Sequence, residues 1–259
     1  MSFQQKDLND LIKAKKLLEN PGLSAKITGL LASPIEKGFK LLPDKWNVKV
    51  SEVTRAALSK AVHAAVFTMK DAPGEGASNM WHKIAVAATG GVGGFFGLAA
   101  LAVELPISTT IMLRSIADIA RSENEPIGTV ASKIACIEVF ALGGPSKSDD
   151  ASNSGYFAIR AALARSVTKA AEYIAGKGLA EEGAPSLLRL IIQIAERFSI
   201  QVSEKAAAQA IPAIGAAGGL LINTLFINHF QDMARGHFIV RRLERMYGKE
   251  TVEATYKTV

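Results

Sequence analysis

The sequence is poor in the residues that hold small disulfide-bonded folds together. It contains one cysteine, Cys136, among 259 residues, so no disulfide can form within the chain. Cys136 lies in the apolar run IACIEVFAL without a basic neighbour, and we interpret it as a small buried hydrophobic residue rather than a nucleophile. The absence of disulfides is typical of a reducing compartment, and we expect a cytoplasmic protein.

The common motifs of catalysis and cofactor binding are also absent. The chain has no GxSxG elbow, no HExxH or ExxH pair and no GxxxxGK[ST] loop. The run GGVGGFFG misses the GxGxxG spacing of a dinucleotide loop, and no strand is predicted before it. The residues therefore assign no catalytic group, no metal site and no cofactor.

Charge of one sign is not concentrated anywhere. The chain has 30 basic and 24 acidic residues, a formal net charge of +6, and both kinds are spread along its length. A nucleic-acid interface gathers Lys and Arg on one face, so we expect no nucleic-acid partner. A mild basic excess suits an anionic membrane surface better. The N-terminus MSFQQKDLNDLIKAKKLLEN lacks the apolar core of a secretory signal, which disfavours export by that route.

What the sequence does have is helical periodicity, without a convincing pair of alternating strands. It predicts an all-α fold, a multi-helix single domain with N-terminal amphipathic helices over 1–47, a main helical domain over 48–248 and a tail over 249–259. The expected helices are 8–18, 51–70 with Ser51 as its cap, 78–105, 107–121 after a break or kink at Pro106, 128–142, 156–175, 185–201 and 203–246 with a kink at Pro212.

Two long uncharged runs contain many glycines. Residues 84–103 form a stretch of 20 and residues 206–228 a stretch of 23, and either is long enough to cross a bilayer as a helix. Pairs such as Gly90 and Gly94 let another helix approach closely. We expect two central Gly-rich helices packed as a hairpin-like core. Gln209 and Asn223 favour burial in protein, while insertion into a membrane stays open.

A second feature is the set of polar residues that interrupt apolar helices, since an unpaired buried charge is costly. Arg114 and Asp118 are four apart and can pair, and His229 and Asp232 are three apart, so that the carboxylate can orient the imidazole. The candidate polar or binding cluster comprises Glu104, Arg114, Asp118, Glu138, Arg160, Asn223, His229, Asp232, His237 and Arg241. These residues form either an internal ion-pair network or a binding or catalytic centre. A basic edge, solvated or facing lipid, is expected from Arg235, Arg241, Arg242 and Arg245.

Several segments together resemble the EcsC family of bacteria. They are GGVGGFFGLAALAVELPISTTIMLRSIADIA, CIEVFALGG, SGYFAIRAALA and IPAIGAAGGLLINTLFINHFQDMARGHFIVRRLERMYG, within a resemblance from about Val48 to Gly248. It implies a helical protein of poorly defined activity, with some relatives encoded beside an ABC transporter implicated in secretion. The N-terminal helix and the tail lie outside the resemblance, which supplies no established catalytic residues.

These observations favour a membrane-associated accessory protein that binds a lipid, an apolar ligand or a membrane partner such as an ABC transporter. Its expected place is the inner face of the membrane, with integral insertion left open. The alternative is a metal- or carboxylate/His-dependent hydrolase that uses Glu104, Asp118, His229 and Asp232 at the end of the Gly-rich helices. A purely structural partner of a transporter is a third interpretation.

Overall fold

The structure is a computed structural model that describes residues 3–19, 22–31, 35–42, 46–68, 97–144, 155–177, 185–211 and 215–259. Within these ranges the regular elements are all helices, which confirms the all-α prediction. The elements are α1 (Gln5–Leu18), α2 (Leu23–Leu31), α3 (Glu36–Phe39), α4 (Trp46–Thr68), α6 (Gly97–Ser122), α7 (Val130–Glu138), the 3-10 helix η1 (Val139–Ala141), α8 (Gly155–Lys177), α9 (Pro185–Gln209), α10 (Gly215–Tyr247) and α11 (Lys249–Thr258).

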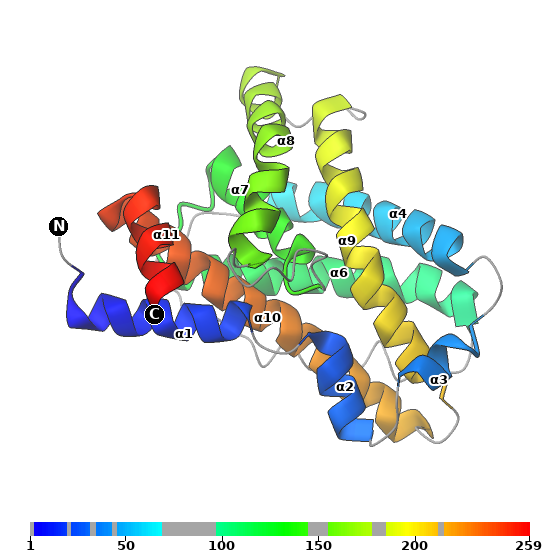
Figure 1. Cartoon of the computed structure of the whole chain (residues 1–259). Coiled ribbons are helices and arrows are strands. Elements are labelled where there is room, and N and C mark those ends of the chain that lie inside the picture. The colour runs from blue at the N-terminus through cyan, green and yellow to red at the C-terminus, as the bar shows by residue number, and fades with distance from the viewer. Residues whose placement is uncertain are drawn as a thin grey trace.

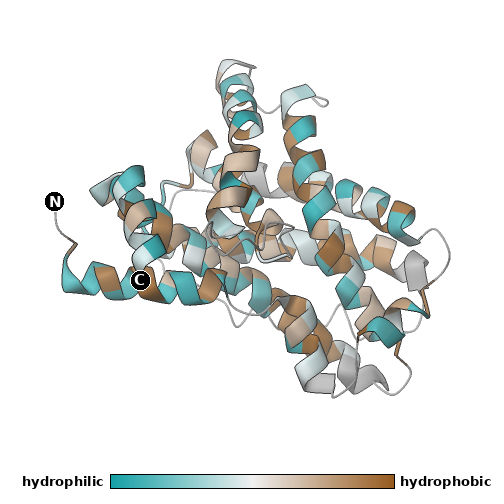
Figure 2. Cartoon of the chain, viewed as in Figure 1, coloured by the Kyte–Doolittle hydropathy of each residue, from teal (hydrophilic) through white to brown (hydrophobic). Residues whose placement is uncertain are grey.

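The longest helix, α10, lies at the centre of the fold (Figure 1) and packs against α1, α2, α6, α9 and α11. Helices α4 and α6 lie side by side, and α8 and α9 project from the body next to each other. Hydrophobic and hydrophilic residues alternate in bands along α1 (Figure 2), as expected for a surface helix with one buried stripe. That stripe is Leu11, Ala14 and Leu18, and it faces α10.

Helix α6 is continuous through Pro106, where the sequence predicted a break or kink between two helices. A proline inside a helix costs about 3 kcal/mol because it removes a hydrogen bond and crowds the preceding turn. Buried side chains on both sides of it, such as Leu105 and Met112, hold the two halves in one helix. Core packing outweighs the local signal here.

Helix α4 begins at Trp46, five residues before the expected cap at Ser51. The Trp46 indole nitrogen donates a hydrogen bond to Ser203 Oγ of α9 at 3.2 Å, and the ring is 7% exposed. Ser51 lies inside the helix, where its hydroxyl donates to the Asn47 carbonyl at 2.9 Å. A tertiary contact with α9 thus decides where this helix starts.

The second uncharged run, 206–228, is divided between two helices. Helix α9 continues past the predicted boundary at residues 201–203 and ends at Gln209, and α10 begins at Gly215. Of the first run, 84–103, the structure describes only the part from Gly97 onward, so the glycines at 90, 93 and 94 and the predicted hairpin lie outside the described residues. Within the described ranges, every helix falls short of the combined length and hydrophobicity that a membrane-crossing segment requires.

The region expected to be one helix over 128–142 is shorter and ends in a tight turn. Thr129 caps α7 by accepting a hydrogen bond from the Ser132 backbone N–H at 3.3 Å. After η1, Gly143 adopts φ +72°, a conformation that favours glycine. A Cβ at this position would lie 2.5 Å from His229 Cε1 of α10, so the turn presses directly on that helix.

The residues after Gly248 form helix α11, although the sequence suggested only a tail. Val252 and Tyr256 are fully buried, and Lys15 Nζ of α1 donates to the backbone carbonyls of Tyr256 at 3.0 Å and Val259 at 2.7 Å. Helices α1 and α11 therefore belong to the same packed body as the rest of the described chain.

Candidate functional site

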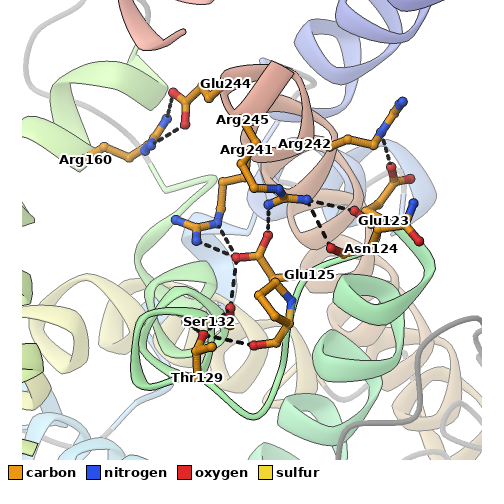
Figure 3. Close-up of polar contacts among 11 residues, drawn as sticks. Glu123, Asn124, Glu125, Thr129, Ser132, Arg160, Arg241, Arg242, Glu244 and Arg245 are labelled. Carbon is orange, nitrogen blue, oxygen red and sulfur yellow. Dashed lines mark hydrogen bonds and ion pairs between the residues drawn. The ribbon is translucent and has the colours of Figure 1, made fainter. Parts of the chain in front are cut away.

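The densest polar contacts lie where the C-terminal half of α10 meets the loop between α6 and α7 (Figure 3). We call Arg241, Arg242 and Arg245 with Glu123 and Glu125 the arginine clasp. Arg241 donates from Nε and Nη2 to Glu125 Oε1 at 3.1 and 2.5 Å, and Arg245 Nη1 binds Glu125 Oε2. One carboxylate thus receives two guanidinium groups from successive turns of one helix face.

Glu125 is the centre of this clasp. Its side chain is only 1% exposed and also accepts a hydrogen bond from Ser132 Oγ of α7 at 3.1 Å. Burial alone would raise the pKa of the carboxyl, but hydrogen bonds from Arg241 and the charges of Arg241 and Arg245 hold the pKa below its usual value. The negative charge of the buried Glu125 carboxylate is therefore balanced by the positive charges of Arg241 and Arg245.

Arg242 extends the clasp to α1. Its guanidinium donates to Glu123 Oε2 at 2.9 Å and to Asp10 Oδ2 at 2.7 Å. Arg241, Arg242 and Arg245 of the predicted basic edge all bind acidic residues of other elements, and their side chains are 22%, 20% and 39% exposed. The edge is therefore an ion-pair network that is partly open to solvent. Arg235, the fourth residue of that expected edge, lies near Asp232 one turn earlier in the same helix, at 3.4 Å.

A second polar group joins α7, α8 and α10 beside the clasp. Arg160 and Glu244 form a two-point ion pair at 2.7 and 2.9 Å (Figure 3), and Arg160 Nη1 also donates to the Tyr156 hydroxyl at 3.3 Å. That hydroxyl and His237 Nδ1 are 3.0 Å apart in a fully buried hydrogen bond. Burial raises the pKa of Glu138, and the charges of Arg160 and Arg241 oppose that rise.

His237 is kept neutral by the same surroundings. Burial, reinforced by the charges of Arg160 and Arg241, holds the pKa of this imidazole well below its usual value. The structure thus brings four predicted residues into one electrostatic neighbourhood, namely Glu138, Arg160, His237 and Arg241. In this neighbourhood the charges of Arg160 and Arg241 offset those of the glutamates on neighbouring elements.

Glu104 belongs to a different group. Its carboxylate accepts a hydrogen bond from Lys205 Nζ of α9 at 2.5 Å, and the two side chains are 7% and 0% exposed. The Lys205 ammonium also lies 5.0 Å from the centroid of the Phe226 ring of α10. This buried pair joins α6, α9 and α10 near the ends at which α6 and α10 begin.

The remaining predicted residues are dispersed. Asp118 pairs with Arg121, while Arg114, its expected partner, is exposed. Asn223 Oδ1 accepts a weak hydrogen bond from Gln209 at 3.5 Å. Asp232 lies 3.5 Å from Lys26 of α2.

His229 does not form the predicted pair with Asp232. The imidazole is fully buried, and neither ring nitrogen has a hydrogen-bond partner among the described residues. Burial, together with the charge of Lys26, lowers its pKa to about 3, so the ring is neutral at physiological pH. The carboxylate that was expected to orient it faces α2 instead.

The four residues of the hydrolase interpretation therefore do not converge. Glu104 and Asp118 are fourteen residues apart on one helix, about 21 Å along its axis at 1.5 Å per residue. Partners in acid–base chemistry must share a substrate within hydrogen-bond reach. In the parts of the chain that the structure describes, no group of three or more His, Cys, Asp or Glu side chains is placed to hold a metal ion.

A different feature stands out at the end of the molecule where α3, α4, α6 and α10 begin (Figure 1). The last turns of α9, residues 203–209, contact each of these elements. Ser203 contacts Trp46 of α4, and Lys205 contacts Glu104 of α6. Ala207 contacts Gly38 of α3, and Gln209 contacts Asn223 of α10. Of the ten large hydrophobic residues exposed within the described ranges, eight lie within three residues of one of these contact points. They are Phe39, Leu41, Val48, Val103, Ile107, Ile200, Leu220 and Leu221, and we call them the apolar end.

The model of the EcsC protein family matches residues 5–243. The chain belongs to the EcsC family. No curated protein and no solved structure gives a significant match to it. The family match includes α1 to α3, which the resemblance seen in the sequence had left out, and this agrees with the packing of α1 on α10.

Sequence reasoning missed the partners that explain the polar residues of this EcsC chain. Glu125, Glu244, Lys205 and Tyr156 were not among the candidates, although each binds one of them. The acidic segment SENEP, directly after a long helix, was the available signal for the arginine clasp. The contacts between different elements join residues from 81 to 116 positions apart, so no helical spacing could reveal them. Only the contact of Tyr156 with Arg160, four residues apart on α8, was accessible from spacing.

Proposed function

We propose that this EcsC-family protein is a membrane-associated accessory protein that docks on the membrane through the apolar end. The observation that carries the proposal is that eight of the ten exposed large hydrophobic residues in the described ranges lie in the segments that meet at one end of the body. Val103, Val48 and Leu41 are 67%, 61% and 55% exposed, which is high for apolar side chains in a protein surrounded by water. A membrane surface would remove this apolar area from water.

The interior gives less support to a hydrolase. Glu104 binds Lys205 of α9, Asp118 binds Arg121 of its own helix, and Asp232 lies 3.5 Å from Lys26 of α2. The three carboxylates are thus each paired with a different basic group. An accessory role needs no such centre, since its activity is the placement of a folded body at a membrane. A transporter partner, as the family resemblance implies, would fit the same surface.

The proposal is tested by lysing cells without detergent and washing the membrane fraction with high salt and then with alkaline carbonate. We expect the protein in the membrane fraction, with release by one of the washes. The triple variant Leu41→Ser, Val48→Ser and Val103→Ser removes the most exposed apolar side chains and is expected to move the protein to the soluble fraction.

A matched control uses the two exposed hydrophobic residues away from the apolar end. Leu188→Ser with Met246→Ser removes exposed hydrophobic side chains of somewhat lower exposure, 44% and 51%, and should leave the distribution unchanged. A wild-type protein found only in the soluble fraction contradicts the proposal, and so does a triple variant that stays on membranes as firmly as the control.

A further inference from the structure

Basic and apolar side chains alternate on the outer surface of α3 and of the first turn of α4. Around α3 the exposed residues are Glu36, Lys37, Phe39, Lys40 and Leu41, and at the start of α4 they are Asn47, Val48 and Lys49. We infer that the apolar end docks on an anionic lipid bilayer, with Lys37, Lys40 and Lys49 as the groups that contact the lipid phosphates. This inference rests on the proposed membrane association and names the lipid chemistry of the same surface.

The inner faces of these two segments are buried in the core. Ile35, Trp46 and Val50 are 3%, 7% and 2% exposed. A Cβ built on Gly38 would lie 1.9 Å from the Ala207 carbonyl oxygen, so the backbone of α3 touches α9 directly. Phe39, Leu41 and Val48 therefore cannot turn inward without breaking these contacts, and the outward display is a fixed property of the fold.

The three lysines differ from the arginines of the clasp. Each clasp arginine binds at least one carboxylate, whereas the structure shows no ion pair to Lys37, Lys40 or Lys49 among the described residues. The ammonium groups are exposed at the ends of flexible stems, beside apolar side chains. Lysines in this position extend their charges toward a phosphate layer while their stems and neighbours contact the acyl boundary.

The neighbouring helices supply the uncharged part of the surface. On α6, Val103 and Ile107 lie four apart on an exposed face, and Glu104 between them in sequence is buried against Lys205. On α10, Leu220 and Leu221 are exposed in a stretch without charges from Gly215 to Asn228. The surface therefore combines an apolar area with a border in which three lysines outnumber the one exposed acid of α3, Glu36, and this is the composition of an interfacial membrane contact.

A second copy of the chain is a poorer occupant. In a two-fold symmetric contact the same surface is contributed by both copies, so six lysines would be collected in one interface. Like charges brought together oppose such association, whereas anionic headgroups neutralise them. Charge complementarity thus selects the bilayer.

The test is co-sedimentation of the purified full chain with vesicles of phosphatidylcholine alone and of phosphatidylcholine mixed with phosphatidylglycerol. We expect strong binding to the anionic vesicles, weak binding to the neutral ones, and loss of the difference in high salt. The variant Lys37→Gln, Lys40→Gln and Lys49→Gln should bind anionic vesicles about 100-fold less well, from about fivefold per lysine.

The control variant Lys6→Gln, Lys169→Gln and Lys249→Gln changes three exposed lysines elsewhere and lowers the net charge equally. It should bind within about twofold of the wild type, because only charges near the surface act strongly on the phosphates. Equal binding of both lysine variants overturns the inference, and so does equal binding of the wild type to both kinds of vesicle.

The remaining outcomes separate this inference from the proposed function. In one outcome the wild type binds both vesicle types equally, and the variant Leu41→Ser, Val48→Ser and Val103→Ser binds neither. That result would support membrane association but reject selection of anionic headgroups. Recovery from cell membranes without vesicle binding would indicate a protein partner and also reject the inference. A wild type that neither binds vesicles nor fractionates with membranes, but dimerises through the apolar end, would reject both proposals.

Discussion

At the scale of single residues, the buried glutamates differ because of what surrounds each carboxylate. Glu125 receives two guanidinium groups and a hydroxyl, and its pKa falls. Glu204 of α9 is 8% exposed and interacts with the Ser24 backbone, and burial raises its pKa to about 7. Burial raises the pKa of both carboxyl groups, so the presence or absence of basic partners decides whether the net pKa shift is downward or upward.

Glu125→Gln is expected to lower the free energy of unfolding by about 2–3 kcal/mol at pH 7, because it leaves Arg241 and Arg245 without their shared counter-charge. The pKa of Glu125 is lower in the folded state than its ordinary value of 4.5, so the carboxyl is ionised at neutral pH and the full loss is seen there. The loss shrinks as pH falls below 4.5 and the carboxyl becomes protonated. Urea unfolding at pH 7 and pH 3.5 measures both effects.

The control is Glu253→Gln, which removes the acid from the exposed pair with Lys257 on α11. That change should cost at most about 0.5 kcal/mol. A Glu125 variant that behaves like this control would show that the arginine clasp contributes no stability.

At the scale of elements, the sequence predicted the helical class and most helix positions, and its errors have a common cause. Local signals at Ser51 and Pro106 indicated boundaries, but α4 and α6 continue through them because buried side chains such as Leu105 and the Trp46 contact hold the helices in place. The same limit applies to the candidate site. Residues with polar side chains in apolar helices were found, while their partners on other elements were not.

The turn after η1 offers an element-scale prediction. Gly143→Ala places a Cβ 2.5 Å from His229 Cε1 and 2.7 Å from Met233 Sδ at a φ of +72°. We expect a loss of about 2–4 kcal/mol in unfolding free energy from backbone strain and overlap with α10. Gly176→Ala in α8, where a Cβ meets nothing within 4 Å, should be neutral or stabilising by up to about 1 kcal/mol. Equal stability of the two variants in urea would mean that the turn does not press on α10.

At the scale of the whole molecule, pH affects global stability through a carboxyl whose pKa is raised by burial in the fold. The pKa of Glu204 rises from an ordinary value of 4.5 to about 7, so the folded state binds more protons than the unfolded state in this interval. Stability from this group therefore falls as pH rises from about 4.5 to 7.

Glu204→Gln removes that dependence. The variant should be about as stable as the wild type, or slightly less, at pH 4.5 and more stable by about 1–3 kcal/mol at pH 8. Thermal or urea unfolding at the two pH values measures the difference, and a variant that loses stability equally at both would contradict a buried protonated Glu204. The comparison isolates this residue because all other titrating groups are shared.

The clasp also sets the order in which the chain can complete its fold during synthesis. Arg242 reaches Asp10 across 232 residues of sequence, and α1 packs on α10 along its buried stripe. Helix α1 leaves the ribosome long before α10, so its apolar stripe and acidic residues gain their partners only when α10 has followed. An interrupted or paused chain would expose that stripe and leave Glu125 without its arginines, so completion of the core is a late, long-range event rather than a stepwise one.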